Sequence, residues 1–130
     1  MKKLLFLALA LSFTGIMLSA QTATPASRDS IIFDKLSHDY GTVMVNSDGN
    51  CVFTFTNKGS EPLVLSNVSA SCGCTVPDWT REPVAPGQTG TIKVTYNTAI
   101  IGAFHKTVTV NSNAVNNPVV LVIQGVISSE

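Results

Sequence analysis

The chain has 130 residues, of which 12% are charged, and its formal net charge is zero. After the first twenty residues, eight acids remain against six bases, so 6 − 8 gives about −2. The bases are scattered singly, at Arg28, Lys35, Lys58, Arg81, Lys93 and Lys106. This distribution excludes the basic patch that nucleic-acid binding requires. The length after residue 20 fits one compact domain.

The N-terminus has the pattern of a cleavable signal peptide. Two lysines precede an apolar run from Leu4 to Leu18, too short for a typical membrane span, and small residues follow at Ser19 and Ala20. We therefore assign residues 1–20 to the signal and expect cleavage before Gln21. The first cysteine is Cys51, which argues against lipid attachment. We expect a periplasmic or secreted protein with no stable membrane anchor after cleavage.

Residues 21–30 have almost no large apolar side chains and are expected to form a flexible lead-in. Within them, Asp29-Ser30-Ile31 resembles the short acidic-Ser/Thr-aliphatic sequence that some bacteria O-glycosylate on exported proteins. Short motifs of this kind also occur by chance. Ser30 is a candidate O-glycosylation site on this basis.

From Ile31 onward the apolar residues recur with a period of two, and turn residues recur about every ten positions. This pattern predicts an all-β domain over residues 31–130, a single immunoglobulin-like β-sandwich of about seven antiparallel strands. One strand is expected to open at Ile31–Phe33 and continue through residues 38–43. The alternation places one set of side chains in the core: Cys51, Phe53, Phe55, Ile92, Val94, Tyr96, Phe104, Val108 and Val110.

Several short motifs support a more specific resemblance. They are Ser71-Cys-Gly-Cys-Thr75, Pro86-Gly87, Ile92-Lys-Val-Thr-Tyr-Asn97, the residues Phe104 and Lys106 to Val108, and Ser112-Asn113. With them the chain resembles the bacterial family catalogued as domain of unknown function 1573. More distantly, Tyr40-Gly-Thr42, Phe55-Thr-Asn57 with Gly59, and residues 122–125 are similar to immunoglobulin-like modules related to major sperm protein and the pilus-chaperone domain. The resemblance implies this fold and export, and it assigns no activity.

Cys72-Gly73-Cys74 is the most distinctive of these motifs. In an extended segment residues two apart share a face, so the two sulfurs emerge side by side. They could form a disulfide, begin a site for copper(I) or zinc, or act as buried thiols at the end of the sandwich. A redox role is less typical, because thiol exchange normally uses Cys-x-x-Cys.

Cys51 is the third cysteine of this candidate site. If residues 63–68 run antiparallel to residues 51–57, Cys51 lies at the same end of the molecule as Cys72 and Cys74. It could then pair with one of them or supply a third metal ligand. The family pattern includes Cys72 and Cys74 but not Cys51, so one cysteine is left over whichever pair forms.

Catalytic signatures are missing from the sequence. There is no Gly-x-Ser-x-Gly elbow, no paired carboxylates outside turns and no Gly-rich phosphate loop. His38 and His105 are single histidines, which are more often surface residues than ligands. We expect no enzyme, no catalytic residues and no cofactor.

The last strand is apolar on both faces from Val119 to Ile123. This composition indicates either a strand covered on both sides or a sheet edge that pairs with a partner's strand. In the second case Val119, Leu121 and Ile123 would mark the partner-binding strand.

Two hypotheses for function follow from these features. The first is an exported, non-enzymatic module that acts structurally or by binding an unidentified protein partner. The alternative is a thiol-based protein that binds copper or zinc, or is redox-active, through Cys72 and Cys74, with or without Cys51.

Overall fold

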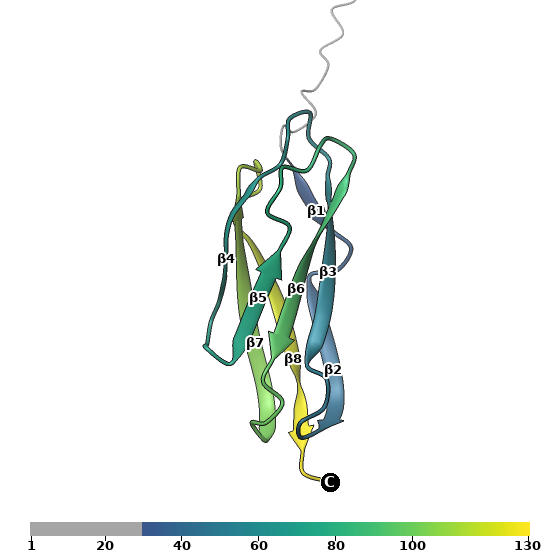
Figure 1. Cartoon of the computed structure of the whole chain (residues 1–130), viewed down its shortest axis with the longest axis vertical. Coiled ribbons are helices and arrows are strands. Elements are labelled where there is room, and N and C mark those ends of the chain that lie inside the picture. Colours follow the sequence, from purple (N-terminus) through teal and green to yellow (C-terminus); the bar gives the residue numbers. More distant parts are fainter. Residues whose placement is uncertain (1–29) are drawn as a thin grey trace, which may run out of the picture.

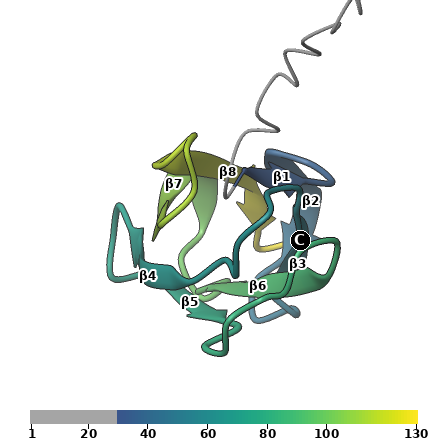
Figure 2. The ribbon, with the colours of Figure 1, turned by 90° about the horizontal axis from the view of Figure 1, so that it is seen from above.

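The computed structural model describes residues 30–130, which form two four-stranded sheets packed face to face (Figures 1 and 2). One sheet has the order β1 (Ile31–Phe33), β3 (Asn50–Asn57), β6 (Thr89–Tyr96), β5 (Thr75–Trp79). The other has the order β2 (Ser37–Met44), β8 (Val119–Ser128), β7 (Gly102–Ser112), β4 (Leu65–Ala70). The predicted all-β sandwich is confirmed, and no helix occurs among these residues.

The core forms where the alternating faces of the two sheets meet. In β3, Phe53 and Phe55 are fully buried, whereas Val52 between Cys51 and Phe53 is 46% exposed. The same alternation in β6 buries Ile92, Val94 and Tyr96. Burial of each large side chain contributes roughly 1.5–3 kcal/mol, so these two central strands carry much of the stability.

The structure corrects the expected first strand. Residues 31–43 do not form one strand, because the segment after Phe33 crosses from one sheet to the other. β1 pairs with β3, and β2 pairs with β8 in the opposite sheet. β5 begins at Thr75, directly after Cys74, and is not expected from the sequence. The sandwich therefore has eight strands rather than about seven.

The expected antiparallel arrangement is also wrong at one place, because β2 runs parallel to β8. The crossing after β1 brings β2 alongside β8 in this direction. Their pairing is irregular between Asp39 and Thr42, where Gly41 has a φ of 67°. Glycine adopts this left-handed conformation without the steric cost that a side chain would add.

Strand β4 pairs with β7, not with β3 as the sequence analysis supposed. Cys51 and the Cys72–Cys74 turn are nevertheless at the same end of the sandwich, because β3 and β5 both pair with β6. Thr95 of β6 is opposite Asn50 on one side and Val76 on the other. The start of β3 and the start of β5 therefore lie level with each other.

A buried asparagine closes the opposite end of β3. The Asn57 side chain is fully buried, and its amide nitrogen donates to the carbonyl oxygens of Glu61 (2.7 Å) and Val84 (2.9 Å). Its amide oxygen accepts from the Gly59 N–H at 2.9 Å. These bonds satisfy a polar group that would otherwise be costly to bury.

Candidate functional site: the disulfide turn and the sheet edges

The Cys-Gly-Cys motif forms the turn that joins β4 to β5. Cys72 and Cys74 are linked by a disulfide across Gly73, and their Cα atoms are 5.3 Å apart. Figure 1 shows this turn at the lower left, at the same end of the sandwich as the C-terminus. Both cysteines are partly exposed, while Thr75 directly after them is buried.

The turn lies at the edge of a sheet, because β5 pairs only with β6. Asn97 N–H donates to Cys74 O (2.8 Å), and Thr80 N–H donates to Thr91 O (3.0 Å). In an antiparallel pair every second residue bonds to the neighbouring strand. Residues 75, 77 and 79 therefore direct their backbone groups away from β6, toward the open edge.

The outward positions of β5 present no free N–H group. The Thr75 N–H donates to the Cys72 carbonyl at 3.3 Å, across the disulfide turn. Pro77 has no N–H, and the Trp79 N–H donates to Asp78 Oδ1 at 3.0 Å. Proline and local capping are known means of preventing a sheet edge from pairing. The disulfide turn thus helps to close this edge.

Cys51 is not joined to the turn. It is free and 6% exposed. Burial raises the pKa of the Cys51 thiol and is the largest influence on it. Burial also raises the pKa of Tyr40, whose hydroxyl donates to Gly49 O at 2.7 Å. A protonated thiol in this setting is a poor nucleophile.

The metal alternative lacks a complete ligand set in the described part of the chain. Across residues 30–130, no group of three or more His, Cys, Asp or Glu side chains could hold a metal ion. His105 is exposed on β7. His38 is partly buried on β2, where Lys35 Nζ lies 3.0 Å from its Nδ1.

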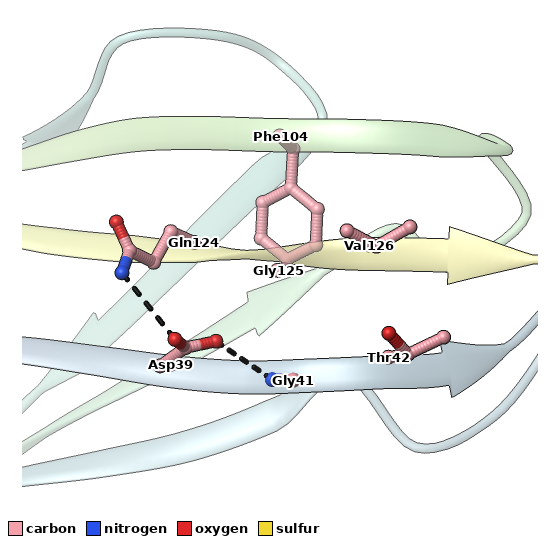
Figure 3. Close-up of a pocket in the computed structure, with 7 residues that line it drawn as sticks. All are labelled: Asp39, Gly41, Thr42, Phe104, Gln124, Gly125 and Val126. Atoms are coloured by element: carbon pink, nitrogen blue, oxygen red, sulfur yellow. Dashed lines mark hydrogen bonds between the residues drawn. The ribbon is translucent and has the colours of Figure 1, made fainter.

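Two hollows lie near these features. One, of about 510 Å³, adjoins the disulfide turn and is bordered by Gly73, Cys74, Val76 and the loops around Asp48 and Asn97. The other, of about 360 Å³, lies over the irregular β2–β8 pairing (Figure 3). There the Phe104 ring lies over Gly125, and Asp39 accepts hydrogen bonds from the Gly41 N–H (2.7 Å) and the Gln124 side chain (3.4 Å).

The last strand is not the sheet edge proposed from the sequence. β8 lies between β2 and β7 and pairs with both, so its backbone is already bonded on each side. Leu121 and Ile123 are fully buried and Val119 is partly buried against the core. The strand-addition interpretation of Val119, Leu121 and Ile123 is therefore wrong. Only the inner face of β8 is fully buried, since Val120 on the outer face is 47% exposed.

The remaining edges differ in their protection. β1 has three residues, and the Asn116 side chain bonds both the Ile31 N–H (3.1 Å) and its carbonyl (2.8 Å). β2 is interrupted by its irregular pairing, and Asp39 caps the Gly41 N–H. Sequence reasoning could not identify these devices, because it did not place these strands at edges.

β4 lacks such protection after Asn67, because its one register shift with β7 lies between Leu65 and Asn67. The Ser71 N–H donates to Thr107 O at 2.9 Å, so Ser69 and Ser71 bond to β7, and Val68 and Ala70 direct their backbone groups outward. These groups have no hydrogen-bond partner within residues 30–130. No proline interrupts Leu65–Ala70, and no charged residue lies between Glu61 and Asp78.

Two expectations concern the N-terminal region. Ser30 is buried, and its carbonyl accepts a hydrogen bond from the Lys58 N–H at 2.9 Å. Its O-glycosylation stays a prediction. The signal at 1–20 and positions 21–29 of the lead-in lie outside the described residues. Within the described region, no helix has the length and apolar character needed to cross a membrane.

Comparison with known proteins identifies the family. Residues 31–127 match the family described as protein of unknown function (DUF1573), and the chain belongs to this family. This confirms the resemblance inferred from the motifs. No curated protein matches the chain.

Solved structures similar to the chain share its fold. A protein of unknown function from Porphyromonas gingivalis W83 is 13% identical, with a TM-score of 0.69 over 79% of this chain and 49% of that one. The chain thus spans about half the length of that protein. The ASH/PapD-like domain 7 of human CEP192 is 8% identical, with a TM-score of 0.66 over 82% and 89%. WR4, a major sperm protein family member of C. elegans, is 9% identical, with a TM-score of 0.50 over 78% and 100%.

Proposed function

We propose that this chain is an exported, non-enzymatic immunoglobulin-like module that binds another protein chain by backbone pairing at β4. The observation that carries the proposal is the open edge at Val68 and Ala70, whose outward backbone groups are unpaired within residues 30–130. Strand addition uses such groups for affinity and neighbouring side chains for specificity. The fold shared with a PapD-like domain is compatible with this role.

The contrast among the edges supports the proposal. An unpaired edge exposes donors and acceptors that favour uncontrolled association, and proteins usually block it. This chain blocks β5 with Pro77 and the disulfide turn, and it caps β1 with Asn116. Unlike β1 and β5, β4 has no cap on its outward backbone groups at Val68 and Ala70. We expect this of an edge that binds another chain.

Site-specific cross-linking tests the binding edge. A photo-cross-linking amino acid at Ser69, which is exposed on β4, should trap a protein chain in the producing cells. The same probe at Thr91, exposed on the interior strand β6, is the matched control. An equal yield at both positions, or no product at Ser69, would contradict the proposal.

Export has a separate test. The basic head and apolar run in residues 1–20 support signal-dependent secretion. We expect N-terminal sequencing of the extracytoplasmic protein to begin at or within a few residues of Gln21. Recovery of the chain only in the cytoplasm, with Met1 retained, would contradict export and leave the binding test unaffected.

A further inference from the structure

The outward groups of β4 form a pattern that is complementary to itself. Val68 and Ala70 each offer one N–H and one carbonyl, and Ser69 between them directs its backbone to β7. If a second β4 approaches antiparallel with Ser69 opposite Ser69, each Val68 lies opposite an Ala70 of the other copy. Such pairs exchange both of their hydrogen bonds. Two pairs with two bonds each then use every outward group of these residues.

The side chains in this register are also compatible. On the exposed face, Ser69 meets its own copy and Asn67 meets Ser71 of the other copy, so small polar groups that can hydrogen-bond are opposed. No like charges are brought together, because the segment between Glu61 and Asp78 is uncharged. On the inner face, Val68 lies beside Ala70, and both contact the apolar core of their own copy.

We propose that the partner at this edge is a second copy of the chain, joined β4 to β4 about a two-fold axis at Ser69. The inference rests on the proposed binding role of β4 and names its occupant. The resulting dimer joins two sheets of the order β2-β8-β7-β4 into one continuous sheet. Figure 2 shows β4 at the flank of the sandwich, where a second copy can approach.

The affinity should be modest, because a single pair of short strands forms a small interface. We expect sedimentation of the purified mature protein to show concentration-dependent dimerisation between about 5 and 500 µM. A monomer throughout this range would overturn the self-pairing.

Charge substitutions at the axis test the register. In a Ser69→Lys protein, two ammonium groups meet at the axis, and dimerisation should weaken by about fivefold. Ser69→Asp should have the same effect by itself. An equimolar mixture of the two should recover dimerisation as a heterodimer, since opposite charges now meet. The matched controls Thr91→Lys and Thr91→Asp, on the exposed face of β6, should dimerise like the original protein.

The outcomes separate this inference from the proposed function. If Ser69→Lys and Ser69→Asp dimerise normally, or if their mixture does not recover, this pairing is wrong. If the purified protein is monomeric and the probe at Ser69 traps a different protein in cells, self-pairing fails and the binding role of β4 stands. If the purified protein is monomeric and the probe traps nothing, both fail.

Discussion

Gly49 shows how closely single residues pack at the end of the sandwich that carries the disulfide. It is buried in the turn before β3, and its carbonyl accepts from Tyr40. A Cβ at this position would overlap the backbone carbonyl of Tyr96, which cannot move without disturbing β6. Gly73 in the cysteine motif is different, since a Cβ there has no neighbour within 4 Å.

We therefore predict a large loss of stability for one glycine substitution and almost none for the other. Gly49→Ala should lower the free energy of unfolding by about 1–3 kcal/mol or more, because the backbone must shift to admit the methyl group. Gly73→Ala should change it by no more than about 0.5 kcal/mol. Urea unfolding followed by the fluorescence of the single tryptophan, Trp79, measures both. Equal losses would show that the space around the two residues is not as described.

Cys51 gives a second prediction at the scale of one residue. Its thiol is buried with a raised pKa, and the other two cysteines are paired. A thiol reagent should therefore find one reactive group per unfolded, unreduced chain, and this group should react far more slowly in the folded protein. Three thiols in the unfolded, unreduced protein would contradict the disulfide. Rapid labelling of folded protein would contradict the burial of Cys51.

Among the elements, the sandwich class and the inward faces of β3 and β6 could be predicted from the sequence, because a period of two is a local signal. Pairing is not local. The segment after Phe33 moves the chain to the other sheet, and nothing in residues 31–43 alone distinguishes this from a bent strand. The same limitation applies to β8, because its residues alone do not show that β2 and β7 pair with its two sides.

The candidate site shows the same difference between local signals, which the sequence contains, and strand pairing, which it does not. The sequence identified the cysteine motif, and the alternation in β3 placed Cys51 in the core. It could not show that the Cys72 carbonyl accepts from Thr75, or that β4 remains open, because these facts depend on which strands have neighbours. An uncharged segment from Pro62 to Pro77 was the one available signal for an open edge.

At the scale of an element, the disulfide turn yields a prediction about β5. The bridge closes a very short loop, so removing it with Cys72→Ser and Cys74→Ser should cost about 1–2 kcal/mol of unfolding free energy while the fold is retained. The backbone bond from Thr75 to Cys72 should loosen with it. We expect faster amide hydrogen exchange at Thr75 in the double variant than in the original protein.

The exchange at Asn97 supplies the internal control for this experiment. Its N–H donates to Cys74 O within the sheet, at the junction of β5 and β6. If the disulfide acts selectively on the β5 edge, its removal should change the exchange rate of the Asn97 amide much less than that of the Thr75 amide. Unchanged exchange at Thr75 would mean that the disulfide does not help to close the β5 edge.

For the whole molecule, His38 links stability to pH. The pKa of His38 lies below its usual value, chiefly because of burial and secondly because of the positive charge of Lys35, while Asp39 opposes the shift. Lys35 can only donate, so His38 Nδ1 accepts and the neutral ring carries its proton on Nε2. The ring edge also meets Tyr40, with centroids 4.6 Å apart. The folded structure thus favours the uncharged imidazole.

The sign of the pH dependence follows from this preference. Because the unfolded chain, with an ordinary histidine pKa near 6.5, binds the proton more readily, the stabilising contribution of neutral His38 is present above that pH. It should fall as the pH drops through 6.5 toward the lower folded pKa. Urea unfolding at several pH values between about 8 and 5.5 should show a decline that is smaller in His38→Gln.

Replacing Lys35 with methionine separates the two causes of this behaviour. The variant removes the positive charge but keeps an unbranched apolar side chain, so the pKa of His38 should rise toward its usual value, and the loss of stability on acidification should shrink. Lys93→Met, which removes an exposed lysine on β6 in the other sheet, is the matched control and should leave the dependence as it was. NMR titration of the His38 ring protons reports the pKa directly. A pKa at or above 6.5 in the original protein would contradict the prediction, because the folded state would then no longer disfavour the charged ring.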